Sequence, residues 1–151
     1  MTGYYDITST LKTALLEDDF VNTVNKGAFN DVDIAKQTIF PLSHLRVENI
    51  SHEDSALRFS IALELLDIVD ISNEQTNDRF RGNDNKDDVF NTQLGVGVRL
   101  VERFRRGDLF TSEYEYGGSA NYEQLDNEYE NGLSGWRLTF DILYKHDMTI
   151  C

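Results

Sequence analysis

An apolar residue occupies every second position in the central stretch of this chain, at Leu57, Phe59, Ile61, Leu63 and Leu65. Side chains of a β-strand point alternately to its two faces, so this run predicts a strand with one buried face. Leu45 and Val47 also alternate with polar neighbours, and residues 51–55 supply turn-forming side chains between the two runs. We therefore expect a β-hairpin here.

The alternation changes after Leu65, where Leu66, Ile68, Val69 and Ile71 follow. Either a β-bulge exchanges the faces of the strand at this point, or the strand end is buried on both faces. The pattern alone leaves both alternatives open.

Further strands are expected in the C-terminal part of the chain. The clearest alternation runs through Trp136, Leu138, Phe140, Ile142 and Tyr144. A shorter one runs through Phe110, Ser112, Tyr114 and Tyr116, and we expect the two to pair. Residues 36–40 form an extended run that ends at Pro41, the only proline.

Two segments have helical spacing instead. Residues 4–17 carry an apolar face of Tyr4, Ile7, Leu11, Ala14 and Leu15. In the second helix, Asp87 or Asp88 can act as the N-cap and Gly107 ends the helix. Its expected apolar stripe is Phe90, Leu94, Val98 and Val101, with Leu100 and Phe104 beside it. Gly97 within this helix is interpreted as a close packing contact.

The order of these elements indicates an α+β fold, an antiparallel sheet of four to five strands with two helices packed on one face. A length of 151 residues suits a single domain spanning 1–151. Residues 72–87 have almost no aliphatic side chains and predict a long polar loop, for which contact with a partner is the simplest purpose.

The charge balance limits the possible partners. The formal net charge of −13 would repel a nucleic-acid backbone, which argues against a dedicated DNA-binding protein. The same surplus suits solubility, or the inner wall of a conduit through which a polyanion passes. The only cysteine is Cys151, so no internal disulfide is expected, and no signal peptide or membrane span is expected either.

No catalytic constellation is recognisable, and we expect no enzyme activity, catalytic residue, cofactor or metal. His44, His52 and His146 are far apart in sequence, and phosphate-binding and nucleophile motifs are missing. One alternative function is a calcium- or small-ligand-binding module that uses the loop at 78–88, where Asn83, Asn85 and Asp87 alternate like the first ligands of a calcium loop. That pattern lacks the glycine and the final glutamate of such a loop.

Arginines gather toward the end of the second expected helix, at positions 99, 103, 105 and 106. They can stabilise and solvate the helix end. Alternatively, Arg99, Arg103 and Arg106 form one strip that meets acidic residues of an identical neighbour, and Arg103→Glu then weakens assembly while the monomer stays folded. The remaining interface candidates are Arg79, Arg81, Asp84, Asp67 and Asp70.

The order of elements resembles that of the tail-terminator or tail-completion (neck) proteins of tailed bacteriophages. Several segments are also similar in sequence to phage neck and tail proteins. These segments are residues 20–24, 36–44, 67–70, 82–85, 91–94 and 136–151. The resemblance implies a structural subunit of the virion, made in the cytoplasm of the host bacterium.

The implied function is a homo-oligomeric ring, hexameric by expectation, that caps the tail tube and joins it to the head connector. Its implied partners are identical subunits, the tail-tube protein and the head-connector protein. No membrane is involved, and DNA at most passes through the lumen of the ring.

Overall fold

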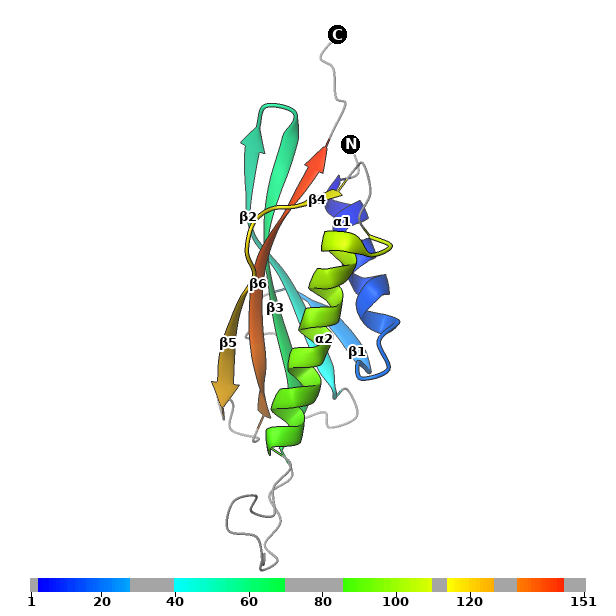
Figure 1. Ribbon diagram of the computed structural model, residues 1–151, viewed down its shortest axis with the longest axis vertical. Coiled ribbons are helices and arrows are strands. Elements are labelled where there is room, and N and C mark those ends of the chain that lie inside the picture. The colour runs from blue at the N-terminus through cyan, green and yellow to red at the C-terminus, as the bar shows by residue number, and fades with distance from the viewer. Residues whose placement is uncertain (1–2, 28–39, 70–85, 110–113, 127–132, 146–151) are drawn as a thin grey trace, which may run out of the picture.

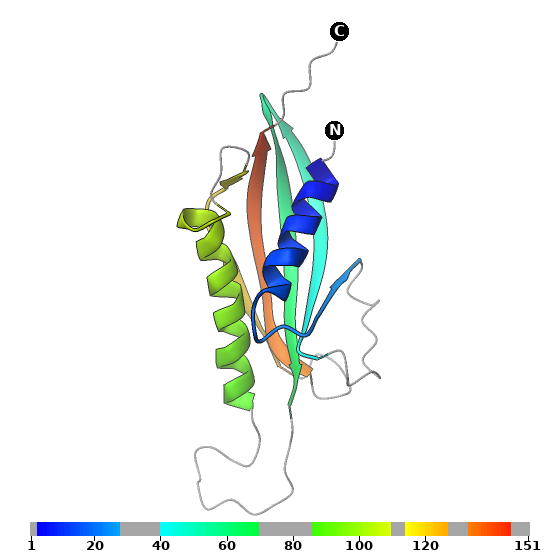
Figure 2. The same cartoon turned by 90° about the vertical axis from the view of Figure 1, so that its right-hand side faces the viewer.

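The computed structural model describes residues 3–27, 40–69, 86–109, 114–126 and 133–145 (Figure 1). In these residues each of two helices is followed by three strands. Their order is α1 (Gly3–Leu16), β1 (Thr23–Lys26), β2 (Leu42–Glu53), β3 (Ala56–Ile68), α2 (Lys86–Arg106), β4 (Tyr114–Tyr116), β5 (Asn121–Asp126) and β6 (Leu133–Lys145). Figure 2 shows both helices in front of one face of the sheet. The expected α+β class is confirmed.

The sheet has six strands in the order β1-β2-β3-β6-β4, with β5 also paired to β6. The expectation of four to five antiparallel strands is wrong in two respects, because β1 pairs with β2 in parallel and because β1 and β5 were not foreseen. Both of these strands are short and lie at the edges of the sheet. The expected pairing of residues 114–116 with the last strand is confirmed.

The β2–β3 hairpin is confirmed, with Asp54 and Ser55 at its tip between the paired Glu53 and Ala56. The register shift lies in β2, between Val47 and Asn49. A bulge after Leu65 is therefore the wrong alternative, because β3 keeps a continuous register with β6 as far as Ile68. Leu65 and Leu66 are both fully buried, so this end of the strand is covered on both faces.

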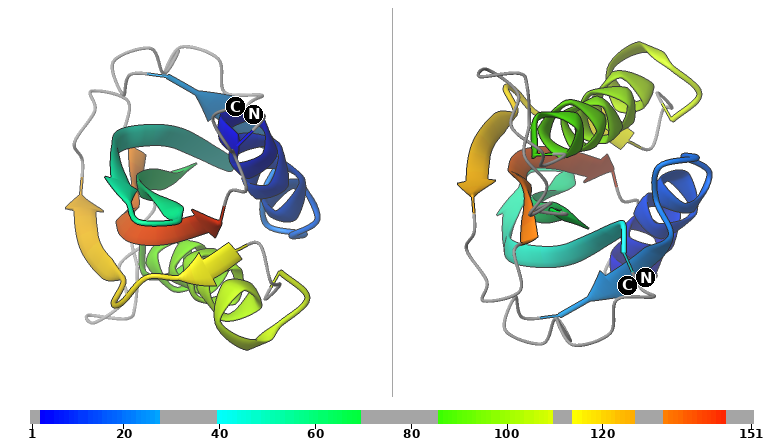
Figure 3. Two further views of the ribbon diagram at one scale, coloured as in Figure 1. Left: turned by 90° about the horizontal axis from the view of Figure 1, so that it is seen from above. Right: turned by 90° about the horizontal axis from the view of Figure 1, so that it is seen from below.

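Two apolar clusters lie on the two faces of the sheet. The larger one lies under the helices and joins Ile7, Leu11 and Leu15 of α1 and Val96, Leu100 and Phe104 of α2 to β3 and β6 residues such as Leu63 and Leu138. Figure 3 shows the sheet curling around these helices. The smaller cluster lies on the other face, where Leu42 and Leu66 are paired neighbours and Phe40, Leu125 and Leu133 join them.

The expected apolar face of α2 is confirmed at Leu100, Val101 and Phe104 but wrong at Val98. The buried residues are Val89, Gln93, Val96, Gly97, Leu100, Val101 and Phe104, whereas Val98 is 42% exposed. Gly97 is a close packing contact, as expected, because a Cβ added there would lie 3.1 Å from both Leu65 Cδ1 and Tyr122 Cε1. Asp87 and Asp88 lie in the first turn of α2, since the helix already begins at Lys86.

Candidate interaction surface

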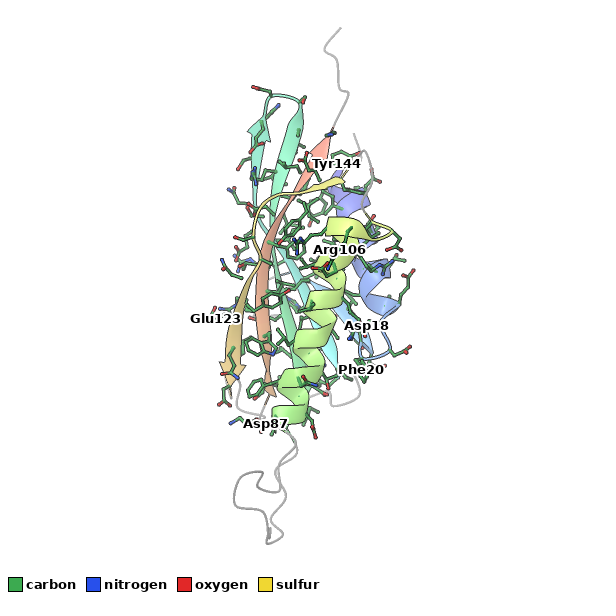
Figure 4. All side chains as sticks on the ribbon, in the orientation of Figure 1. Asp18, Phe20, Asp87, Arg106, Glu123 and Tyr144 are labelled. Atoms are coloured by element: carbon green, nitrogen blue, oxygen red, sulfur yellow. The ribbon has the colours of Figure 1, made fainter. Side chains whose placement is uncertain are left out.

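A groove of about 580 Å³ separates the end of α1 from the middle of α2. The chain leaves α1 through a turn closed by hydrogen bonds from Asp18 N to Leu15 O and from Val21 N to Asp18 O, each 3.1 Å long. This turn brings Asp18 and Phe20 against α2 (Figure 4). We call these residues and the facing side of α2 the interhelical groove.

Arg99 ties the turn to α2. Its Nε donates to Asp18 Oδ2 at 2.7 Å and its Nη2 donates to Asp18 Oδ1 at 3.0 Å, the two-pronged geometry in which a guanidinium binds a carboxylate most strongly. The same guanidinium lies 5.6 Å from the centre of the Phe20 ring. Burial alone would raise the pKa of Asp18, but hydrogen bonds from Arg99 and from the Phe20 N–H outweigh it, so the Asp18 pKa lies below its ordinary value.

Arg103 lies one turn further along α2 and joins the two helices. It donates to Asp108 Oδ1 at 2.7 Å and to Asp108 Oδ2 at 2.6 Å. The same Nη2 lies 2.9 Å from Glu17 Oε2, and Nη1 donates to the Ala14 carbonyl at 3.4 Å. Two carboxylates from opposite sides of the groove therefore meet at one guanidinium.

Arg105 and Arg106 share one acidic partner on their own helix. Arg106 Nε donates to Glu102 Oε2 at 2.6 Å, and Arg105 Nη1 donates to Glu102 Oε1 at 3.0 Å. The hydrogen bond from Arg106 is the main reason that the pKa of Glu102 is lowered. The Arg106 side chain remains 81% exposed, so this pair lies on the surface of α2.

The expected strip of Arg99, Arg103 and Arg106 is thus divided. Arg99 and Arg103 line the interhelical groove, whereas Arg106 does not. Each of the three binds an acidic residue of its own chain, where the sequence suggested an identical neighbour. Because Arg103 holds two carboxylates, Arg103→Glu would place three carboxylates together and is expected to disturb the monomer as well as any assembly.

Of the other interface candidates, only Asp67 lies within the described residues. Asp67 lies near the end of β3, is partly buried and accepts a hydrogen bond from Ile68 N at 2.8 Å. Burial raises its pKa. Arg79, Arg81, Asp84 and Asp70 lie outside the described residues, as does most of the loop at 78–88 proposed for calcium. Within the described ranges, no group of three possible metal ligands occurs.

Exposed apolar side chains flank the groove and were not foreseen. Phe20 is 51% exposed and lines the groove, and Leu16 at the end of α1 is 47% exposed. Interface cores are enriched in aromatic residues and arginine, so Phe20 stacked on Arg99 has the composition of a contact site. The signal in the sequence was the phenylalanine directly after two aspartates that close a helix.

A buried ion pair on the opposite face of the sheet was also missed. Glu64 is fully buried and accepts a hydrogen bond from Arg137 Nη2 at 2.8 Å. Arg137 Nη1 also reaches Glu123 Oε2 of β5 at 3.2 Å, and the hydrogen bond with Glu64 is the main cause of its raised pKa. These side chains are adjacent in the ladder and fix β5 to the sheet, a structural role.

No protein-family model matches this chain, and no curated protein matches it. Among the helices that the structure describes, none has the length and apolar character needed to cross a membrane. A functional interpretation therefore depends on the chain's own surface, in particular the interhelical groove.

Proposed function

We propose that this chain is a structural subunit of a bacteriophage tail or neck. Identical copies form a ring, which we expect to be a hexamer. This ring caps the tail tube and joins it to the head connector. The observation that carries the proposal is the interhelical groove, where Phe20 is about half exposed beside two arginines. Such a surface suits protein contact.

The element order supports the same proposal. A helix, three strands, a second helix and three further strands follow one another in the described residues, and the proposal takes this helix-and-strand alternation as the order that resembles tail-terminator proteins. The hairpin tip projects beyond both helices, which gives the subunit a second surface away from the groove (Figure 1). A subunit that connects a tube to a connector needs separate surfaces for the two.

Charge complementarity within the groove also suits repeated contact between copies. Glu17, Asp18 and Asp108 provide carboxylates, and Arg99 and Arg103 provide guanidinium groups. The exposed carboxylates Glu17 and Asp108 are the ones that can exchange partners when a second copy approaches, because exposed pairs contribute little individually. The aromatic ring of Phe20 then supplies the apolar contact that surface ion pairs lack.

The experiment is sedimentation of the purified protein, alone and with tail-tube protein or head-connector protein. We expect wild type to form an oligomer or to bind one of the two, and Phe20→Ser to reduce this binding. Val98→Ser is the matched control, since Val98 is 42% exposed on α2 and does not line the groove. Circular dichroism checks that both variants fold. A wild-type protein that stays monomeric and binds neither partner contradicts the proposal.

A further inference from the structure

The two edges of the sheet end in short strands at the same level. Pairing places Thr23 beside Leu42, Leu42 beside Leu66, Leu66 beside Gly135 and Gly135 beside Leu125. The same succession leads from Lys26 across the sheet to Tyr122. All four residues of β1 therefore have counterparts in β5 on the same rows of the sheet.

The directions of these two strands also match. β1 is parallel to β2, and each later step through β3 and β6 to β5 is antiparallel. Consequently β5 runs opposite to β1. If a second copy is placed beside the first with its strands in the same direction, its β5 approaches β1 as an antiparallel partner.

Within the part of the chain that the structure describes, β1 pairs with β2 alone, so the backbone groups on its other edge have no strand beside them. Thr23 N donates to Pro41 O and Gly27 N donates to Leu45 O, so the backbone groups of these alternate residues point toward β2. The N–H groups of Val24 and Lys26 then point away from β2. Within the described residues, β5 pairs with β6 alone, so its far edge has no strand beside it.

Charge favours pairing of unlike edges over like edges. β1 carries Lys26 and no acidic residue, whereas β5 carries Glu123 and Asp126, which are 66% and 48% exposed. Two β5 strands side by side would gather four carboxylates, which their own partners Arg137 and Lys86 neutralise only in part because both carboxylates stay exposed, and two β1 strands would gather two lysines. Charged edge strands commonly discourage self-pairing in this way.

The space beside β1 is consistent with a neighbour. A groove of about 310 Å³ runs between α1 and β1, lined by Lys12, Val24 and Lys26 among others. By contrast, the part of β2 beyond β1 is interrupted by the register shift after Val47, which makes it a poor template for pairing. Figure 1 shows β1 and β5 on opposite sides of the molecule.

We propose that β5 of one copy adds to the open edge of β1 in the next copy, so that a continuous sheet runs through the assembly. This contact joins two different surfaces, and a head-to-tail contact of that kind generates a closed ring when the rotation permits. The inference rests on the proposed ring and specifies the contact between its subunits.

Cysteine cross-linking tests the contact, in a background where Cys151 is replaced by serine. Val24→Cys protein is mixed with protein carrying Gln124→Cys, the position on the same row and face, and then oxidised. Tyr122→Cys and Asp126→Cys allow for a shift of two residues, which preserves the face. In the control, Val24→Cys protein is mixed with Ile50→Cys protein instead of a protein that carries a β5 cysteine.

We expect a disulfide-linked dimer in the mixture for one of the three β5 positions and none with Ile50→Cys. Val24→Pro should abolish self-association with an unchanged circular dichroism spectrum, because it removes an N–H that points away from β2. An oligomeric wild type without any of the three cross-links overturns the edge contact and leaves the ring proposal standing. A wild type that is monomeric at every concentration overturns the edge contact, and one that also binds neither tail-tube nor head-connector protein overturns the ring proposal as well.

Discussion

Gly135 is a residue at which backbone geometry leaves no room for a side chain. A Cβ built there would overlap the Leu65 carbonyl oxygen on the neighbouring strand β3. Leu66, next in β3, is fully buried and pairs with Gly135, so neither strand can move away without opening the smaller apolar cluster. The glycine is therefore a requirement of the pairing between β3 and β6.

We expect Gly135→Ala to lower the free energy of unfolding by about 3 kcal/mol or more, at the upper end of the range for overpacked cores. Gly95→Ala is the matched control in α2. There an added Cβ meets only the end of the Arg99 side chain, 3.0 Å from Nη1, and the helix should gain at most about 1 kcal/mol because Asp18 holds that guanidinium. Urea unfolding measures both. Equal stability of Gly135→Ala and wild type would show that the two strands are further apart than described.

The second residue-scale prediction concerns the pH dependence at Asp67. Burial raises the pKa of its carboxyl above the ordinary value, so the ionised form is disfavoured in the folded protein. The resulting cost is fully present above the raised pKa and disappears below the unfolded value of about 4. Asp67→Asn should therefore be more stable than wild type at pH 7, and the difference should vanish as the pH falls to about 4.

Denaturant titrations of Asp67→Asn and wild type at several pH values provide the measurement. Asparagine keeps an oxygen that can accept the hydrogen bond from Ile68 N, so the comparison isolates the charge. Asp141 on β6 is a useful control. Its Oδ2 lies 3.2 Å from Arg58 Nη1 on β3, so replacing Asp141 removes a partnered carboxylate. A lower stability of Asp67→Asn at neutral pH would mean that Asp67 has a favourable partner when ionised.

Among the elements, α2 shows how a helix can be located from sequence while its orientation is misjudged. The line through Phe90, Leu94 and Val98 is apolar, but the line through Val89, Val96 and Leu100 is the one that packs against the sheet. Gln93 lies on the buried line and is fully buried. A pattern that assigns polar residues to the surface rejects that line.

The orientation of α2 can be tested with two valines that are two residues apart and point to opposite sides of the helix. Val96→Ala should lower the free energy of unfolding by about 2 kcal/mol, because Val96 is 1% exposed in the larger apolar cluster. Val98→Ala should change stability little, since Val98 is 42% exposed and alanine is the better helix former. Thermal and urea unfolding compare them. A larger loss for Val98→Ala would restore the stripe expected from the sequence.

The strands differ in how well their sequences predict them. The face of β3 and β6 that lies under the helices is apolar along most of both strands. Period-two alternation therefore predicts both strands. β1 has only four residues, and β5 buries a single apolar side chain fully, that of Leu125, among polar neighbours. Strands of this kind leave no pattern in the side chains.

The interhelical groove was only half predictable for a related reason. The arginines of α2 are visible as a cluster in the sequence, but their partners Asp18 and Glu17 come from a turn about eighty residues earlier. Periodicity describes which face a residue occupies on its own element, and says nothing about which distant element covers that face. Long-range ion pairs follow from the packing of α1 beside α2.

At the scale of the whole molecule, the net charge of −13 opposes assembly of identical copies. The proposed contacts are short in range, since each ion pair of the groove lies within 3 Å and edge pairing uses backbone hydrogen bonds. The repulsion between copies instead acts over the width of a subunit. Salt therefore affects the short contacts and the long-range repulsion unequally, because screening weakens interactions beyond the Debye length most strongly.

We expect self-association to strengthen as ionic strength rises from about 0.01 M to about 0.15 M, where the Debye length falls from about 30 Å to about 8 Å. Screening removes long-range repulsion between copies while leaving most of the short contacts intact. Sedimentation velocity at several protein concentrations measures the association constant at each salt concentration. Sodium sulfate at matched ionic strength is the control for effects specific to the anion. Association that weakens steadily over this range would show that exposed ion pairs between copies, and not apolar and backbone contacts, hold the assembly together.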